Sequence, residues 1–286
     1  MSNPLSSRVQ KVKPSATLQI TAKANELKSQ GVQIVPMGSG EPDFDTPINI
    51  KEAAAKAIQD GKTRYTPVDG TVELKQAIIS KFERENNLQF SANEVMVSSG
   101  GKHVFYNLCQ AILDSGDEVI IPAPYWVSYP DMVILAEGSP VIIPTDLDQN
   151  FKITPEQLEN SINPRTKLLV LNSPSNPTGA VYSKSELLGL AKVLNKHKHV
   201  HIITDDIYEH ICLGDEEFVN ILMADNSLKD RTIILNGVSK AYAMTGWRIG
   251  YAAGPEDIIK AMKKIQSQST SNPCSIAQSA AVEALN

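Results

Sequence analysis

The sequence predicts an α/β fold built on a mostly parallel, seven-stranded sheet with helices on both faces. Short apolar, β-branched runs alternate with longer helical patterns from Val95 onward. Parallel strands joined by crossover helices require this alternation. The chain has 286 residues, of which 42% are hydrophobic, so it can bury one large domain and part of a second, small α/β domain.

Seven short runs are predicted strands, and helical patterns fill the gaps between most of them. The predicted strands are residues 95–98, 118–121, 141–143, 168–171, 201–204, 232–235 and 248–253. Three helices are predicted ahead of or beside the first strand. The first, 18–30, ends at Gly31, the second, 48–60, follows Thr46-Pro47 and ends at Gly61, and the third is 72–85. We expect residues 1–45 to form an N-terminal arm and part of the small domain, and residues 46–286 to form the large domain.

Charge and cysteine content exclude several classes of partner. Lys and Arg number 27 against 32 Asp and Glu, the net charge is −5, and no basic block occurs, which argues against nucleic acid. Three separated cysteines, with no Cys-x-x-Cys pair, fit a reducing compartment. No apolar run has the length of a signal peptide or a membrane span. We therefore expect a cytoplasmic protein that does not bind membranes.

Polar and aromatic residues follow five of the predicted strands. In open α/β sheets, ligands bind beyond the carboxyl ends of the strands. The residues at these positions are Ser99-Gly100-Gly101-Lys102, Tyr125-Trp126, the segment 172–179, Asp205-Asp206-Ile207-Tyr208 and Ser239-Lys240. The sequence predicts that they converge on one rim of the sheet.

Each motif alone has an ordinary structural explanation. Gly100 and Gly101 open a helix directly after a strand, where backbone N–H groups bind phosphate, but glycines also simply mark turns. Asp205 and Tyr208 fit a helix N-cap followed by a packing tyrosine. An isolated lysine is usually solvated, yet Lys240 lies among small residues between two apolar strands, and a buried lysine with a lowered pKa suits imine chemistry.

Taken together, the motifs resemble the class I aminotransferases of pyridoxal phosphate (PLP) fold type I, most of all the bacterial-type aspartate aminotransferase subgroup. The resemblance extends from about Pro14 to the end of the chain. The motifs that carry it are Gly40-Glu41-Pro42-Asp43-Phe44, Asn176-Pro177-Thr178-Gly179, Asp205-x-x-Tyr208, and Ser239-Lys240 with Arg248 eight residues on. It implies an enzyme that binds PLP and moves amino groups between amino acids and 2-oxo acids.

The resemblance also implies catalytic roles. Lys240 would form the Schiff base with the cofactor and move the proton of the substrate Cα. Asp205 would pair with the pyridine nitrogen and keep it protonated, so that the ring accepts electrons. Asn176 and Tyr208 would donate to the phenolate oxygen of the cofactor, and Trp126 would stack on its ring.

Phosphate binding is implied for a second group. Arg248 would hold the phosphate together with the amides of Gly101 and Lys102, because a guanidinium matches phosphate oxygens. Tyr65, in Thr63-Arg64-Tyr65-Thr66-Pro67, resembles the family tyrosine that reaches the phosphate of the neighbouring subunit. A homodimer with shared active sites follows from that role.

Substrate contacts are predicted at Gly40, Asn176, Trp126, Lys102 and Lys13. The backbone of Gly40 would meet the substrate carboxylate, although Gly38-Ser39-Gly40 also fits an ordinary turn. Arg248 is assigned to the phosphate, so Lys102 is a cation available for a second carboxylate. This favours aspartate as substrate and 2-oxoglutarate as acceptor.

Three alternatives remain at this point. The resemblance implies a further C-terminal part of the small domain, with an arginine for the substrate α-carboxylate, and Arg248 is the last arginine of this sequence. A non-catalytic protein that retains the PLP lobe is therefore one alternative. Lyases and enzymes acting on prephenate or aromatic 2-oxo acids share the same residues. His197, His199 and His201 would share one face of a strand, but they lie opposite the predicted rim and beside lysines, which argues against a metal site.

Overall fold

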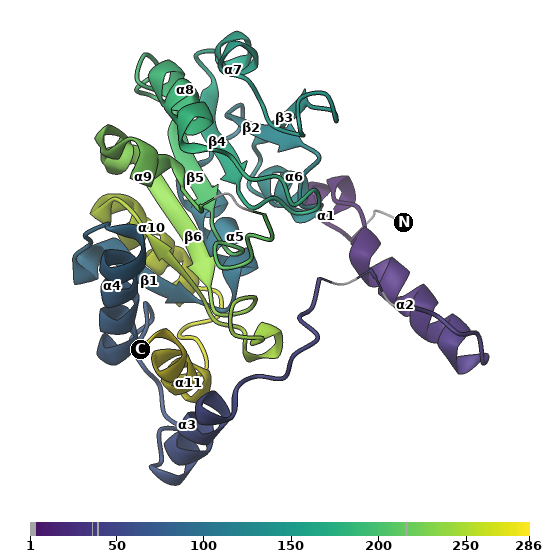
Figure 1. The fold of residues 1–286 in the computed structure, drawn as a ribbon, viewed down its shortest axis with the longest axis vertical. Coiled ribbons are helices and arrows are strands. Elements are labelled where there is room, and N and C mark those ends of the chain that lie inside the picture. The colour runs from purple at the N-terminus through teal and green to yellow at the C-terminus, as the bar shows by residue number, and fades with distance from the viewer. Residues whose placement is uncertain (1–3, 36, 39, 215–216) are drawn as a thin grey trace.

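The computed structural model describes residues 4–35, 37–38, 40–214 and 217–286. One seven-stranded sheet lies between two layers of helices (Figure 1), which confirms the predicted α/β class. The strands are β1 (Val95–Ser98), β2 (Glu118–Ala123), β3 (Ser139–Pro144), β4 (Thr166–Asn172), β5 (His201–Asp205), β6 (Thr232–Gly237) and β7 (Gly250–Ala253). In the described ranges, no helix has the length and apolar character needed to cross a membrane.

Eleven α-helices and three short 3₁₀ helices are described. The α-helices are α1 (Ser7–Lys11), α2 (Ala16–Ser29), α3 (Ile48–Gln59), α4 (Val72–Asn86), α5 (Gly101–Ile112), α6 (Ser128–Leu135), α7 (Pro155–Ser161), α8 (Lys184–Leu194), α9 (Ile221–Ala224), α10 (Glu256–Ser267) and α11 (Ser275–Leu285). The 3₁₀ helices are η1 (Ala92–Glu94), η2 (Asn226–Arg231) and η3 (Thr245–Trp247).

The strand order brings the predicted functional segments to one edge of the sheet. The order is β1-β7-β6-β5-β4-β2-β3, and only β7 runs antiparallel to its neighbours. The carboxyl ends of β1, β2, β4, β5 and β6 therefore lie at the same edge. Loops that leave these ends can surround one ligand.

Side chains alternate between the two faces of the sheet, as the period of a strand requires. On β4, Leu169 and Leu171 pack with helices α3, α4, α8, α9 and α11, whereas Leu168 and Val170 face the other core with α5, α6 and α10. Both faces of the sheet are apolar, which explains why the central strands appear in the sequence as continuous hydrophobic runs.

All seven predicted strands are confirmed, although β2 to β6 extend one or two residues beyond the predicted ends and the predicted start of β7 is wrong. Arg248 is exposed and left-handed, with φ 57°, and β7 begins only at Gly250. The three predicted helices are α2, α3 and α4, with ends shifted by one or two residues. The Thr71 side chain caps α4 by accepting from the Leu74 N–H at 3.2 Å, a signal that the apolar period alone does not contain.

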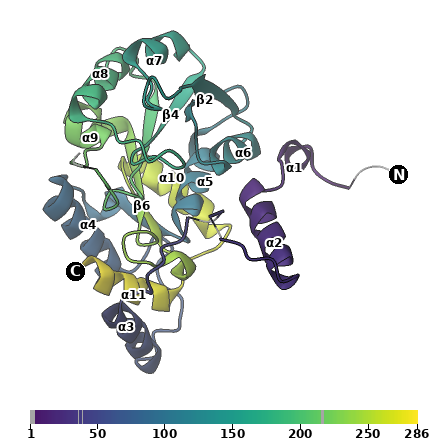
Figure 2. The same cartoon turned by 45° about the vertical axis from the view of Figure 1, so that its right-hand side comes forward.

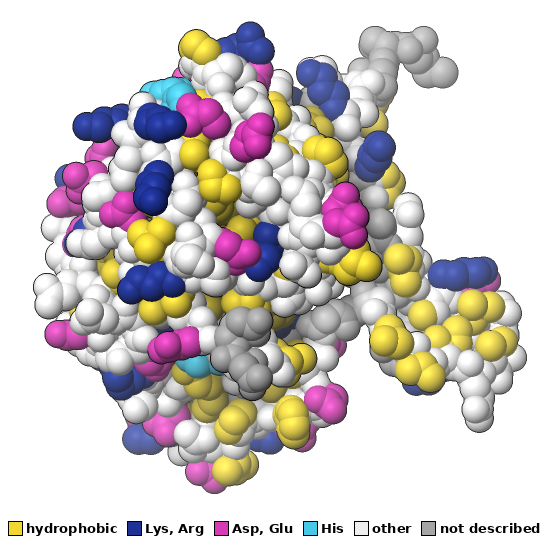
Figure 3. Space-filling model, turned by 45° about the horizontal axis from the view of Figure 1, so that its top comes forward, with side chains coloured by type: hydrophobic (Ala, Val, Ile, Leu, Met, Phe, Trp, Pro, Cys, Tyr) yellow, Lys and Arg dark blue, Asp and Glu magenta, His cyan; other side chains and the backbone are white. Residues whose placement is uncertain are grey.

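The N-terminal helices stand apart from the sheet. Figures 1 and 2 both show α2 projecting away from the main body, while α1 lies near α6. Figure 3 shows apolar side chains on the surface of the projecting part, and Ile20 and Val32 are among its exposed apolar residues. The domain boundary near residue 45 stays a prediction.

Candidate active site

A cavity of about 580 Å³ lies at the carboxyl edge of the sheet. It is lined by residues from β4, β5, β6 and the loops around them. The predicted site residues that line it are Gly40, Gly101, Lys102, Trp126, Asn176, Asp205, Tyr208, Ser239, Lys240 and Arg248. Gly100 does not line it but adjoins Arg248, which does, whereas Lys13 and Tyr65 are exposed and do not line it.

Lys240 points its amine into this cavity. Nζ donates a hydrogen bond to the carbonyl of Gly40 and lies 5.8 Å from the centre of the Tyr208 ring. Burial lowers the pKa of the Lys240 amine, Glu41 opposes this effect and Arg248 adds to it. A larger share of the amine is therefore neutral and nucleophilic than for a solvated lysine.

Asp205 is the buried acid of the cavity. It ends β5, is 4% exposed, and accepts a hydrogen bond from the Ile207 N–H at 3.3 Å. Burial raises the pKa of this carboxyl to about 6, and the hydrogen bond from Tyr129 opposes that rise. Such a carboxylate stabilises a cation placed against it.

Tyr208 and Asn176 meet at the cavity wall. The pKa of the Tyr208 phenol is raised, first by burial and then by the Asp205 charge, while a hydrogen bond with the Asn176 side chain opposes the rise. The backbone N–H of Asn176 donates to Oδ1 of Asn172 at 2.7 Å, which fixes the loop after β4. Both side chains therefore present donors to a polar ligand atom.

Gly100 and Arg248 form a close-packed cup at the N-terminus of α5. A methyl group added at Gly100, whose φ is 92°, would lie 2.3 Å from Nη2 of Arg248. Nη1 of Arg248 donates to the Thr245 carbonyl at 2.7 Å, which orients the guanidinium. A guanidinium and the free N–H groups of a helix start form an anion site of the kind that holds phosphate.

Trp126 and Lys102 lie together on another wall. Nζ of Lys102 is 5.0 Å from the centre of the Trp126 ring. Burial lowers the pKa of Lys102, and the nearby Arg248 charge lowers it further. Lys102 and Arg248 both line the cavity, so two basic side chains lie at its walls.

The segment before α3 closes over the Lys240 loop. Besides the Gly40 contact, Thr46 Oγ1 donates to the Ala243 carbonyl at 2.6 Å, and Trp247 Nε1 donates to Thr46 at 3.0 Å. Sequence reasoning assigned Gly40 to the substrate but missed this clamp. Ser39, the centre of the predicted turn, lies outside the described residues.

Sequence reasoning also missed Tyr129. It lies in α6, is 1% exposed, and its hydroxyl donates to Oδ2 of Asp205 at 2.5 Å. Its ring also packs edge-on against Trp126, with 5.2 Å between the ring centres. One tyrosine thus contacts both the acid and the indole of the site.

The predicted start of the strand at His201 is confirmed, and the three histidines do not share one strand. Only His201 belongs to β5, because the chain turns at His197 and His199 after α8. His197 lies 2.8 Å from a Glu159 oxygen, and His199 lies 3.2 Å from the Asn163 carbonyl. The His197 and His199 rings also pack edge-on against each other, with 6.1 Å between their centres.

The donor set fits PLP. The cup at Gly100 matches its phosphate, the buried Asp205 matches its pyridine nitrogen, and the Lys240 amine matches its aldehyde. These residues could hold that cofactor on an α/β fold. The predicted resemblance is confirmed: the chain belongs to the class I and II aminotransferase family, whose model matches residues 32–286.

Named relatives cover nearly all of the chain. The aspartate/prephenate aminotransferase of Nitrosomonas europaea is 63% identical over 282 residues, which are 99% of this chain and 71% of that protein. The aspartate aminotransferase structure from Rhizobium meliloti is 50% identical, covers 100% of this chain and 71% of its own, and superposes with a TM-score of 0.96. The Thermus thermophilus aspartate aminotransferase structure with maleate has a TM-score of 0.95 at 50% identity, over 100% of this chain and 73% of its own.

Proposed function

We propose that this aminotransferase binds PLP and moves an amino group between aspartate and a 2-oxo acid such as 2-oxoglutarate. The observation that carries the proposal is that one cavity brings together the Lys240 amine, the buried Asp205 carboxyl and the cup of Gly100 and Arg248. These groups come from separate loops, and a packing role for any one of them would not require the others.

Some residues of the cavity bind the cofactor, and Lys240 transfers a proton. When bound, PLP supplies an electrophilic aldehyde and a ring that accepts the electron pair left at the substrate Cα. Lys240 Nζ would take the proton from Cα and deliver it to the aldehyde carbon of the cofactor, a role that its lowered pKa favours. Asp205 holds a proton on the pyridine nitrogen, and Tyr208 and Asn176 orient the ring by hydrogen bonds.

Two observations support a dicarboxylic substrate. Lys102 brings positive charge to the cavity in addition to Arg248, and it is free to meet a second carboxylate. The relatives named above are aspartate or aspartate/prephenate aminotransferases, and one structure was determined with maleate, a dicarboxylate. Gly40 and, more weakly, Lys13 are further proposed contacts.

Prephenate is a second candidate acceptor. The Nitrosomonas europaea relative carries this activity in its name. Prephenate has two carboxylates, so the same positive charge would serve it. Comparing prephenate with 2-oxoglutarate as acceptors separates the two candidates.

We also propose a homodimer in which Tyr65 reaches the partner's cofactor phosphate. Tyr65 is 92% exposed, and a large exposed aromatic ring on a loop suits an intersubunit contact. The loop is held in place because Nε2 of Gln278 donates to Thr66 at 3.0 Å and Nε2 of Gln266 donates to the Val68 carbonyl at 2.7 Å.

The direct test incubates the purified protein with PLP, aspartate and 2-oxoglutarate and measures glutamate and oxaloacetate. We expect both products in equal amounts, and their loss in Lys240→Ala. Decarboxylation or elimination products would indicate a lyase instead. PLP binding without any turnover would support the non-catalytic alternative.

A further inference from the structure

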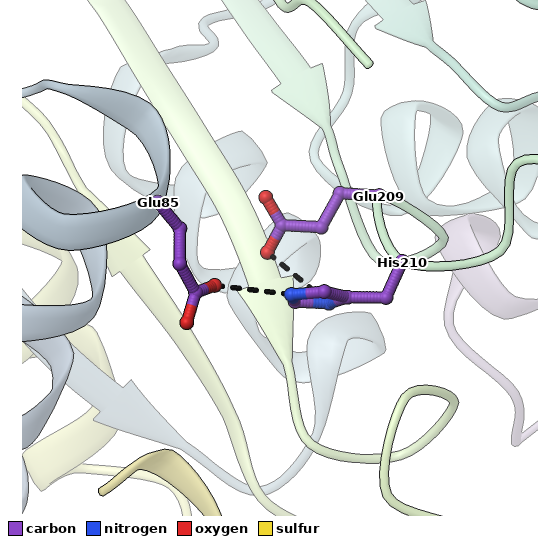
Figure 4. A group of neighbouring side chains, drawn as sticks. All are labelled: Glu85, Glu209 and His210. Atoms are coloured by element: carbon purple, nitrogen blue, oxygen red, sulfur yellow. Dashed lines mark hydrogen bonds and ion pairs between the residues drawn. The ribbon is translucent and has the colours of Figure 1, made fainter. Parts of the chain in front are cut away.

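A charged cluster adjoins the active site, with Lys81 and Glu209 buried and Glu85 and His210 exposed. It consists of Lys81 and Glu85 of α4 and Glu209 and His210 of the loop after β5, and Figure 4 shows three of these side chains converging. Nε2 of His210 is 3.0 Å from Glu85 Oε2, and Nδ1 is 3.7 Å from Glu209 Oε1. One ligand atom from each of these three lies within 4.8 Å of the others, as in a metal site.

Lys81 supplies the cation of this cluster. Its Nζ is 3.6 Å from Glu85 Oε2 and donates a hydrogen bond to Glu209 Oε1, and its side chain is 0% exposed. Arg84 Nη2 lies 2.5 Å from Glu85 Oε1, so the Lys81 ammonium and the Arg84 guanidinium together balance the two carboxylates, and the charges do not call for a metal ion. The cluster is therefore an internal ion pair that needs another explanation.

Glu209 is fully engaged by hydrogen bonds. Besides Lys81, Nδ2 of Asn86 donates to its Oε2 at 3.0 Å, and Nδ2 of Asn236 donates to its Oε1 at 2.8 Å. Nζ of Lys81 also donates to Asn86 Oδ1 at 2.8 Å. One buried carboxylate thus joins α4, the end of β6 and the loop after β5.

The hydrogen bonds of Glu209 link it to segments that carry Tyr208 and Lys240. Glu209 directly follows Tyr208, whose phenol lines the cavity on the other side of the chain. Asn236 lies in β6, four residues before Lys240. A shift of Glu209 would therefore change the position of Tyr208 relative to the lysine amine.

We propose that Glu209, neutralised by Lys81, is a positioning residue that fixes Tyr208 relative to Lys240. The inference deepens the proposed function and rests on it. Well-packed apolar residues would stabilise a core at least as well as a buried ion pair, whereas removing one partner alone leaves a costly buried charge. A role in geometry explains why four polar groups meet at one carboxylate beside the active site.

The test separates positioning from stability with Lys81→Met, Glu209→Gln and the double variant. Glu118→Gln is the matched control, because Glu118 is also a buried carboxylate, 8% exposed, bound by Arg165 at 2.8 Å and by Asn163 at 2.7 Å. It begins β2, so it lies at the opposite edge of the sheet. Each protein is measured for melting temperature, PLP dissociation constant by tryptophan fluorescence, and kcat and KM for aspartate.

We expect Lys81→Met to have a lower melting temperature than the parent, because Glu209 is left as an unpaired buried charge. The double variant should have a melting temperature near that of the parent, because it leaves neither of these charges unpaired. The double variant should still lose about tenfold in kcat with little change in KM, and bind PLP about tenfold more weakly, as for misplaced reacting groups. Glu118→Gln should keep the parent's kcat and PLP affinity.

A double variant with the parent's kcat and PLP affinity would overturn the proposal and leave a structural ion pair. If the double variant does not fold, the kcat and the PLP affinity of Glu209→Gln decide whether Glu209 is a positioning residue. If the parent binds PLP but shows no transamination, the proposed function fails, and the PLP affinities of the variants still decide whether Glu209 positions the site.

Discussion

The hydroxyl of Tyr129 lies 2.5 Å from Oδ2 of Asp205, and both side chains are buried. Burial alone disfavours the carboxylate, whereas a hydrogen bond to it favours the charged form. Tyr129 therefore keeps Asp205 ionisable at neutral pH while the protein around it remains apolar.

Tyr129→Phe should raise the pKa of Asp205 above its value of about 6, because the opposing hydrogen bond is lost. We expect the acid limb of the kcat/KM profile to move to higher pH, with a roughly tenfold loss at pH 6 and a smaller loss at pH 8. Tyr182→Phe is the control, since it also removes a buried hydroxyl, which accepts from the Ile153 N–H at 2.9 Å outside the main cavity. An unshifted profile in Tyr129→Phe would contradict the assignment.

Asp205 should also impose a pH dependence on the stability of the protein without cofactor. Its pKa rises from 3.8 to about 6 on folding, so its favourable contribution exists at low pH and is lost as the pH rises through 6. Between pH 4 and 7.5, the unfolding free energy of the parent relative to Asp205→Asn should fall by about 1–3 kcal/mol. Denaturant titrations measure this difference.

Asp225 provides a control of opposite sign. Hydrogen bonds from Ser227 lower its pKa, so its contribution is lost as the pH falls. The stability of the parent relative to Asp225→Asn should therefore decrease towards low pH. The same trend for both variants would mean that the Asp205 carboxyl is not responsible.

Gly100→Ala should weaken PLP binding. The new methyl group would meet the Arg248 guanidinium at 2.3 Å and force it out of the cup. Losing charge-assisted contacts to phosphate should raise the PLP dissociation constant at least about tenfold. Gly116→Ala imposes a comparable positive φ, 98°, with no atom within 4 Å, and should change stability only. Equal PLP affinities in the two variants would argue against a phosphate cup.

Lys102→Ala tests the substrate class. If Lys102 meets the second carboxylate, kcat/KM for aspartate should fall about ten- to a hundredfold while that for alanine changes little. An equal loss on both amino acids would make Lys102 a cofactor residue. The substrate side chain would then have to be recognised elsewhere.

The fold and much of the site follow from local sequence signals. The central strands are buried on both faces, so β4 and β5 appear as uninterrupted apolar runs, and the residues after them, such as Asn176 and Asp205, were predicted to converge. The cavity contains both of these residues. Because these strands are parallel, the residues that follow them in the sequence lie at the same edge of the sheet.

What the sequence did not contain are contacts between distant segments. In the sequence, Tyr129 has the pattern of a packing residue of α6. Its hydrogen bond joins it to Asp205, which lies 76 positions away. Thr46 likewise contacts Ala243 across 197 positions. Arg248 was predicted to begin a strand, yet its backbone is left-handed, with φ 57°, and β7 begins at Gly250.

The central claim is that Lys240 is the residue bound covalently to PLP. Borohydride reduction of the protein with PLP, followed by proteolysis and mass spectrometry, tests it most directly. We predict a pyridoxyl group on the peptide that contains Lys240, and none on that peptide in Lys240→Ala. A label carried mainly by Lys102 or by another lysine would contradict the assignment of the active site.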